Sequence, residues 1–325
     1  MTGGAGYIGS VLVADLLARG FRVRVLDALY YDNQVALRGF LDHPGFEFVE
    51  GDITDPDAVR KSVRSCSDVV HLAALVGDPV CKKYPELARR VNHDASIQLV
   101  QSAAEHGIGR FVFVSTCSNY GLRNDDECAT EESELNPVSL YAETKVAVER
   151  HLVSAYSDSD MVTSILRLAT AHGLSPRMRF DLTVSEFTQE LHAGNRLSVY
   201  DFDTWRPYCH VKDISRSIIN VLLADCSKVK GQVFNVGDDS QHYTKKQLVE
   251  LITRTLGRGE VEFVEKSVDP RNYRVSFQKV KDTLGFTVSE DVAASIERLK
   301  KALNGSEYSD YDRRITFYRN HEIKS

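Results

Sequence analysis

A tyrosine and a lysine four residues apart are the side chains whose types and spacing best suit catalysis. Tyr141 and Lys145 fall in a segment expected to be helical, so both side chains would lie on one helix face within reach of each other. An ammonium group beside a phenol favours the phenolate and lowers its pKa from about 10, which makes tyrosine a usable base. This pair could remove a hydroxyl proton while a hydride leaves the same carbon.

A threonine is expected beside this pair. The unbroken apolar run at residues 110–115 is typical of a buried parallel strand. It delivers Thr116, Cys117 and Ser118 to the carboxyl edge of a sheet, where ligands of such sheets bind. The Thr116 hydroxyl could hold the same substrate oxygen as Tyr141 and share its proton.

Three glycines near the start of the chain predict a nucleotide-binding turn. Gly3, Gly6 and Gly9 open into an apolar helical run, and this spacing permits a tight turn and close backbone approach to a pyrophosphate. Amide groups at the helix start would face the anion along the positive end of the helix dipole. A strand then ends in Asp27, whose carboxylate would accept the hydroxyls of an adenosine ribose, and Asp52 at the next strand end could reach the adenine.

The glycine turn lacks the strand that normally leads into it. Only Met1 and Thr2 precede it, so either about five residues lie upstream or the central strand is absent. We expect residues upstream, because losing a central parallel strand would leave its neighbours without ladder partners.

Composition excludes several classes of protein. The chain has 325 residues and a formal net charge of −6 with acids and bases interspersed, so nucleic-acid binding is not expected. No apolar run reaches the roughly 18 residues of a membrane span. The six cysteines show no CxxC pair and no metal-ligand spacing, so we expect no metal and a reduced, cytoplasmic protein.

Strand and helix patterns alternate along the first half of the chain. Strands are expected at residues 46–49, 68–74 and 162–167, and a long helix at 85–106. This rhythm predicts an α/β fold, a doubly wound parallel (Rossmann) sheet with helices on both faces. We expect a dinucleotide-binding domain over residues 1–168, to which 211–240 return, and a smaller C-terminal substrate-binding lobe over 169–325. The polar and aromatic tail from Gly305 has no assignment.

Taken together, these motifs resemble the extended short-chain dehydrogenase/reductases, specifically the nucleotide-sugar epimerase/dehydratase family. The likeness spans almost the whole chain, with motifs in order and at matching separations. It is carried by Thr2–Gly9, Asp27, Gly51-Asp52-Ile53, His71-Leu72-Ala73-Ala74, Asn92, Ser115-Thr116, Tyr120-Gly121, Tyr141 with Lys145, Arg167, and Arg206 to Asp213.

The resemblance implies a tightly held NAD, transient oxidation of a sugar carbon, usually C4, and a homodimer formed through paired helices. Tyr141 becomes the base, Lys145 lowers its pKa and holds the nicotinamide ribose, and Thr116 binds the reacting oxygen. With no arginine directly after it, Asp27 favours NAD over NADP. The cofactor-binding residues implied are Gly3, Gly6, Tyr7, Ile8, Gly9, Asp27, Asp52, Ile53, Leu72, Ala73, Ala74, Asn92, Tyr141 and Lys145. The substrate-binding residues implied are Thr116, Cys117, Ser118, Thr170, Arg179, Arg206 and Arg271.

Two departures from the family pattern bear on the reaction. Similar sugar 4,6-dehydratases have an acid pair after the catalytic threonine, where this chain has Cys117 and Ser118. The family asparagine of Arg-x-x-Asn is Thr170 here, which affects the sugar contact. The leading hypothesis is therefore a nucleotide-sugar epimerase that acts through C4. A 4-dehydrogenase, 4-ketoreductase or dehydratase of the same family is the alternative, and a non-catalytic nucleotide-binding protein is a remote one.

Overall fold

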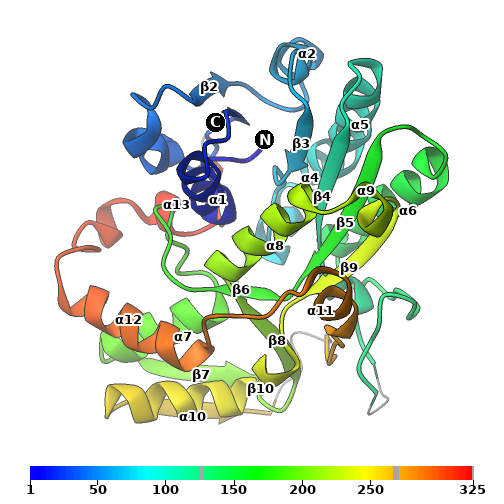
Figure 1. Cartoon of the computed structure of the whole chain (residues 1–325). Coiled ribbons are helices and arrows are strands. Elements are labelled where there is room, and N and C mark those ends of the chain that lie inside the picture. Colours follow the sequence, from blue (N-terminus) through cyan, green and yellow to red (C-terminus); the bar gives the residue numbers. More distant parts are fainter. Residues whose placement is uncertain (124–126, 266–270, 324–325) are drawn as a thin grey trace.

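A parallel sheet forms the centre of the larger lobe. The computed structural model of the chain describes residues 1–123, 127–265 and 271–323 (Figure 1). Two ladders, β1–β2 and β3–β4–β5–β9, have parallel strands throughout. The strands are β1 (Val23–Asp27), β2 (Phe46–Glu50), β3 (Asp68–His71), β4 (Arg110–Thr116), β5 (Val162–Leu168) and β9 (Gln232–Val236). This arrangement confirms the predicted doubly wound α/β fold.

The first residues of the chain join the two ladders. Thr2 makes parallel bridges to Leu26 of β1 and to His71 of β3. Its N–H donates to the Val70 carbonyl (3.0 Å), and the Leu72 N–H donates to the Thr2 carbonyl (3.2 Å). Residues 1–3 therefore occupy the central place of the sheet, between β1 and β3.

Helices cover both faces of this sheet, and the apolar side chains of each face form a separate core. The first core takes in α1 (Tyr7–Ala18) and α8 (Val211–Leu223), which pack on each other. The second core takes in α2 (Pro56–Val63), α5 (Ala95–Glu105) and α6 (Leu140–Tyr156). The shorter segments around them are η1 (Asn33–Phe40), α3 (Asp78–Lys83), α4 (Pro85–Arg89), η3 (Cys117–Tyr120) and α9 (Cys226–Val229).

The helix expected over residues 85–106 is interrupted. A π-helical turn, η2 (Arg90–Asp94), lies between α4 and α5. The Asn92 side chain in this turn both accepts from the Leu75 N–H (2.7 Å) and donates to the Leu75 carbonyl (3.0 Å). The turn therefore fixes the loop that follows β3.

The second lobe is built from two small sheets and their helices, which lie below the main sheet in Figure 1. One sheet has the order β10–β8–β6 and the other pairs β11 with β7. An apolar core joins α7, α10 and α12 to these strands. The elements are β6 (Thr170–His172), α7 (Thr183–His192), β7 (Arg196–Tyr200), β8 (Trp205–His210), η4 (Asp239–Gln241), β10 (His242–Thr244), α10 (Lys245–Leu256), β11 (Glu260–Val264) and α12 (Val292–Asn304). Helix α11 (Gln278–Leu284) instead packs on β9 of the main sheet.

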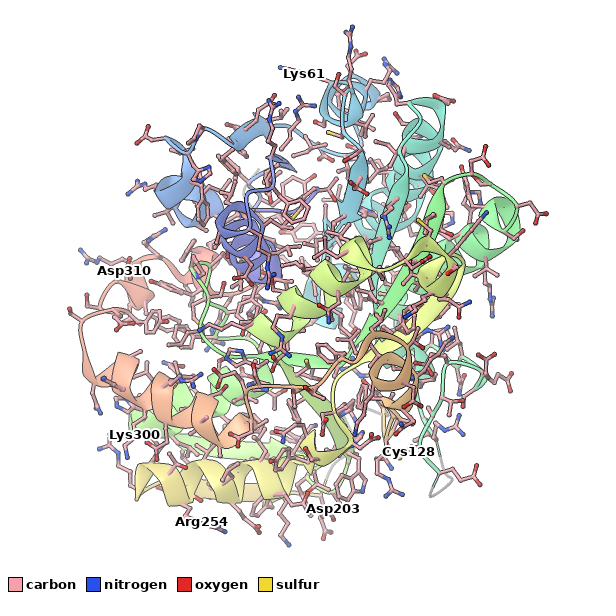
Figure 2. All side chains as sticks on the ribbon, viewed as in Figure 1. Lys61, Cys128, Asp203, Arg254, Lys300 and Asp310 are labelled. Carbon is pink, nitrogen blue, oxygen red and sulfur yellow. The ribbon has the colours of Figure 1, made fainter. Side chains whose placement is uncertain are left out.

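The C-terminal tail, which had no assignment from sequence, returns to the first helix. It contains η5 (Tyr311–Arg313) and α13 (Ile315–Tyr318), and α13 lies beside α1 in Figure 1. Phe317 and Tyr318 share a buried cluster with Tyr7 and Val11. Polar side chains occupy the outer faces of the helices, as Lys61 on α2 and Arg254 on α10 illustrate (Figure 2). The tail is therefore part of the folded body.

A buried ion pair fixes β5 against α6 behind the end of β4. Arg167 and Glu149 are joined by a contact of 2.7 Å, and their side chains are 6% and 4% exposed. The same carboxylate accepts from Ser115 and from Asn119 (2.8 Å). Every donor here converges on one acid, so removing that acid would leave a buried cation without its counter-charge.

We expect Glu149→Ala to lower the free energy of unfolding by about 3–5 kcal/mol, because a buried charge that loses its partner is not resolvated. Urea denaturation measures this loss. Glu260→Ala is the matched control, since its pair with Arg196 has exposed side chains and should change stability by less than about 1 kcal/mol. Equal losses for the two variants would contradict the interpretation.

Candidate active site

One cavity of about 440 Å³ lies where the main sheet meets the second lobe. Its wall combines the glycine turn, the ends of β1, β3 and β4, one face of α6, and residues of the second lobe. The predicted site residues that line it are Gly3, Gly6, Tyr7, Ile8, Gly9, Asp27, Asp52, Ile53, Leu72, Ala73, Ala74, Thr116, Ser118, Tyr141, Lys145, Thr170, Arg179, Arg206 and Arg271. Asn92 and Cys117 are not among the lining residues.

The glycine turn fits a pyrophosphate. Gly3 has φ +73°, and a Cβ there would lie 2.7 Å from the Ala73 nitrogen. A Cβ on Gly9 would lie 2.2 Å from the Gly3 carbonyl oxygen. Helix α1 follows Gly6 with no side-chain cap, so N–H groups of its first turn are available to an anion in the cavity. The turn therefore requires glycine, and the helix start suits a phosphate group.

Asp27 braces this turn and lines the cavity. Its carboxylate accepts from the Ala5 N–H (2.9 Å) and the Leu29 N–H (2.9 Å). Burial raises the pKa of Asp27, while these hydrogen bonds and the Arg177 cation act in the opposite direction. Asp27 therefore both holds the glycine turn and lines the cavity at the strand end where a ribose is expected. Asp52, at the corresponding place after β2, accepts a hydrogen bond from the Tyr30 hydroxyl.

Tyr141 and Lys145 lie in the first turns of α6, which begins after Ser139. The Ser139 side chain caps the helix by accepting from the Ala142 N–H (3.4 Å). Lys145 Nζ donates to the Val114 carbonyl (2.8 Å) and lies 6.0 Å from the centre of the Tyr141 ring. Burial lowers the pKa of Lys145 to about 8, although the Glu149 carboxylate opposes that shift.

Lys145 is not among the groups that shift the pKa of Tyr141 here, so the expected lowering of that pKa by Lys145 stays a prediction. Burial raises the pKa of Tyr141, the nearby Cys81 adds to the rise, and the Arg179 cation counteracts it. Lys145 is held by the strand carbonyl rather than by the phenol. A positive charge that reaches the phenol in the loaded site is therefore needed before Tyr141 can act as a base near neutral pH.

Thr116 ends β4 at the cavity. Its hydroxyl oxygen accepts from the Ser118 N–H (3.1 Å), and the Ser118 hydroxyl lies 3.3 Å from that of Tyr273. The intervening Cys117 turns inward: its thiol is 1% exposed and donates to the Arg167 carbonyl (3.2 Å). Burial raises the pKa of Cys117, so its thiol stays protonated at neutral pH.

The arginines predicted for the substrate differ in their contacts. Arg206 donates to the Trp205 carbonyl (2.7 Å) and lies 5.3 Å from the Tyr273 ring centre. Arg271 forms an ion pair of 3.1 Å with Asp78 across the two lobes. Arg274 stands over the Trp205 ring and does not line the cavity.

A second buried ion pair lies in the cavity wall. Arg179 and Asp181 are joined by two hydrogen bonds, of 3.0 and 2.6 Å. Burial alone would raise the pKa of Asp181, but the Arg179 guanidinium holds that pKa at about 2. The pair is therefore ionised and mutually satisfied at neutral pH.

Several lining residues were not predicted from the sequence. Asp78 and Lys245 line the cavity, as do Arg177, Asn320 and His321. The segment Ser175–Asp181 contains a pattern that could have indicated Arg177. In it, Arg177 and Arg179 alternate with apolar residues, which is typical of an extended chain with one face toward a polar ligand. Asn320 and His321 sit in the aromatic tail, where sequence spacing gave no indication of a site.

Within residues 1–123, 127–265 and 271–323, no group of His, Cys, Asp and Glu side chains could hold a metal ion. In the same part of the chain, no helix has the length and apolar character to cross a membrane. All six cysteines are unpaired.

Comparison with known proteins identifies the family. Residues 1–237 match the NAD dependent epimerase/dehydratase family, and the chain belongs to it. A dTDP-glucose 4,6-dehydratase of Streptomyces griseus is 31% identical over an alignment of 305 residues, which covers 90% of this chain and 90% of the relative. A UDP-glucose 4-epimerase of Corynebacterium glutamicum is 28% identical and covers 88% of this chain and 89% of the relative.

Solved structures agree with this assignment. The dTDP-glucose 4,6-dehydratase DesIV of Streptomyces venezuelae, determined with NAD, has a TM-score of 0.85 at 27% identity and covers 94% of this chain and 97% of its own. The UDP-glucose 4-epimerase of Thermus thermophilus, also with NAD, has a TM-score of 0.80 at 26% identity, with 94% and 98% covered. This protein is therefore an NAD-dependent enzyme of the epimerase/dehydratase family.

We expect Asp27→Asn to reduce the preference for NADH over NADPH by about tenfold or more, because the carboxylate repels a 2′-phosphate and the amide does not. Fluorescence titration with each nucleotide measures both dissociation constants. Glu47→Gln, an acid-to-amide change on the exposed side of β2, is the control and should leave the ratio unchanged. An unaltered ratio in Asp27→Asn would show that the acid does not face the ribose.

Proposed function

We propose that the protein is a nucleotide-sugar epimerase that inverts C4 through transient oxidation of that carbon. The observation that carries the proposal is that Thr116, Tyr141 and Lys145 line the same cavity as the glycine turn, whereas the two residues after Thr116 offer no carboxylic acid. Dehydration by the acid-pair route needs an acid there to expel water. Cys117 is buried with a raised pKa, and Ser118 is a poor acid.

Three of the four acids that line the described cavity wall are engaged by groups outside the proposed substrate ligands. Asp181 is paired with Arg179, whereas Asp78 is paired with Arg271 and its Oδ1 has no hydrogen-bond partner among the described residues. Asp27 accepts from the glycine turn and Asp52 from Tyr30. These contacts disfavour Asp27, Asp52 and Asp181 as free proton donors to a leaving hydroxyl, which supports hydride chemistry without loss of water.

The proposed mechanism uses two side chains at the sugar oxygen and a third near the cofactor. NAD, when bound, would supply the acceptor and donor of the C4 hydride. The Tyr141 phenolate takes the proton from the C4 hydroxyl, and Thr116 donates a hydrogen bond to the same oxygen. Lys145, anchored on the Val114 carbonyl, adds positive charge near the cofactor ribose. Return of the hydride to the other face of the ketone, with the proton given back by Tyr141, yields the C4 epimer.

The second lobe would hold the nucleotide diphosphate. Arg206 and Arg271 line its side of the cavity, and a planar guanidinium donates two hydrogen bonds to one phosphate. Residues 1–168, together with 211–240, would form the cofactor-binding domain, and the rest of 169–325 would form the substrate-binding lobe. We propose that the enzyme acts in the cytoplasm. Thr170 replaces the family asparagine on the cavity wall, and we propose that it contacts the sugar.

A dehydratase is the second candidate, because relatives with that name reach 31% identity over 90% of this chain. The same cavity would then oxidise C4 and eliminate water. A 4-dehydrogenase or 4-ketoreductase would use the identical hydride step and release the keto sugar or the reduced product.

A panel of UDP-, GDP-, CDP- and dTDP-sugars, incubated with the protein and NAD, distinguishes these candidates. We expect one substrate to give a product of unchanged mass with an inverted proton coupling at C4, measured by mass spectrometry and NMR. Loss of 18 mass units or accumulation of NADH would instead identify a dehydratase or a 4-dehydrogenase.

Tyr141→Phe is the matched control for that assay, since it removes only the reacting hydroxyl. Turnover should fall by about 10²–10⁴-fold, the usual contribution of general acid–base catalysis, while NAD remains bound. An unchanged rate would remove Tyr141 from the mechanism.

We also propose a homodimer that pairs the outer faces of α4 and α6. A surface hollow lies between these helices, lined by Glu86, Arg90, Glu143 and Ala147 among others, and its mixed charges suit a self-complementary contact. Sedimentation equilibrium should give twice the chain mass of 36.4 kDa, and a monomeric mass at micromolar concentration would contradict the proposal.

A further inference from the structure

Arg177 is a buried cation for which the catalytic scheme has no use. It lines the cavity and is 2% exposed. Its guanidinium donates to Asn320 Oδ1 (2.6 Å), while its buried Nε has no hydrogen-bond partner among the described residues. Burial, together with the neighbouring Arg179, lowers the pKa of Arg177 to about 10, so the side chain is still charged at neutral pH. A buried, charged donor that is only partly satisfied calls for an anionic ligand.

The loop that carries Arg177 is fastened to the first turn of α1. The Ser175 hydroxyl donates to the Tyr7 carbonyl (2.7 Å) and lies 3.1 Å from the Ser10 hydroxyl. The Tyr7 hydroxyl in turn donates to the Gly173 carbonyl (2.6 Å). Arg177 therefore belongs to the second lobe in sequence, yet its backbone is held at the helix start that faces the cofactor pyrophosphate.

The guanidinium lies beside residues at and after the end of β1. It stands 4.9 Å from the centre of the Tyr31 ring, which follows β1, and its charge reaches Asp27. Its partner Asn320 donates to the Val76 carbonyl (3.4 Å), in the loop after β3. The first turn of α1, which has no side-chain cap, lines the same cavity as Arg177, and Ser175 ties the loop of Arg177 to that turn.

We propose that Arg177 binds the pyrophosphate of NAD from the second lobe, opposite the amides of the glycine turn. Its planar fork suits two phosphate oxygens at once, and the Tyr31 ring beneath it restricts the orientation of the plane. Two walls of donors, one of backbone amides and one of a guanidinium, would then enclose the dianionic group. The proposal concerns the cofactor of the family and is independent of which sugar is converted.

Asn320 is the positioning residue for Arg177. It is 6% exposed and is fixed by a third contact, from its own N–H to Asp181 Oδ2 (3.1 Å). The tail that delivers it is anchored on Phe180, whose ring makes edge contacts with Tyr308 and Tyr311 at 5.1 and 5.2 Å. The C-terminal segment thus completes the cofactor site rather than only covering the surface.

The test compares ligands that have and lack the pyrophosphate. NADH binding is followed by its fluorescence after resident nucleotide has been removed with charcoal, and ADP and adenosine are used as competitors. In Arg177→Gln we expect the dissociation constants for NADH and ADP to rise about tenfold to a hundredfold, as for loss of hydrogen bonds to a charged group. The dissociation constant for adenosine should change by less than about twofold, because adenosine lacks the phosphates.

Asn320→Ala provides a second, independent variant in case Arg177→Gln does not fold. It keeps the cation but removes its partner, and it should weaken ADP several-fold without weakening adenosine. Glu322→Gln is the control from the same tail, because its pair with Lys83 is exposed and should leave all three constants unchanged. Equal losses for ADP and adenosine, or no loss for either, would overturn the proposal.

Discussion

The site depends on a backbone approach that only glycine allows. The turn at residues 3–9 passes so close to the strand end at Ala73, and to its own carbonyl at Gly3, that a Cβ on Gly3 or Gly9 would overlap backbone atoms. Because the turn carries no side chains at these glycines, a ligand has room at the start of α1, which has no side-chain cap. It also lets Thr2 and Gly3 bond to strands on both sides, so the turn and the centre of the sheet form one rigid unit.

Burial sets the chemistry of the groups around that turn. It raises the pKa of Tyr141 and lowers that of Lys145 to about 8, which shifts both toward their neutral forms. By contrast, the Arg179 guanidinium lowers the pKa of Asp181 to about 2, and the buried Arg167 is paired with Glu149. The cavity therefore combines two buried groups whose pKa values are shifted, Tyr141 and Lys145, with the Arg179–Asp181 ion pair in its wall.

The main sheet, and the meeting of Thr116, Tyr141 and Lys145 in one cavity, could be predicted from the sequence, because their patterns are local. Apolar runs identify β4 and β5, and the rule that ligands bind at the carboxyl ends of parallel strands brings Thr116 to the cavity that Tyr141 lines. The direction of a side chain at the end of a strand or in a helical turn depends on tertiary contacts. Cys117 points inward, and Asn92 hydrogen-bonds the Leu75 backbone. Arg177 and Asn320 meet across 143 residues, a contact no periodicity could indicate.

The fate of the C4 hydrogen tests the proposed chemistry most directly. With a nucleotide sugar deuterated at C4, the account predicts that the inverted product keeps its deuterium at C4 when the reaction runs in ordinary water, because the same hydride leaves and returns within the cavity. Loss of the label to solvent would contradict hydride return. A product that has lost water, with the label moved to another carbon, would assign the cavity to a dehydratase instead.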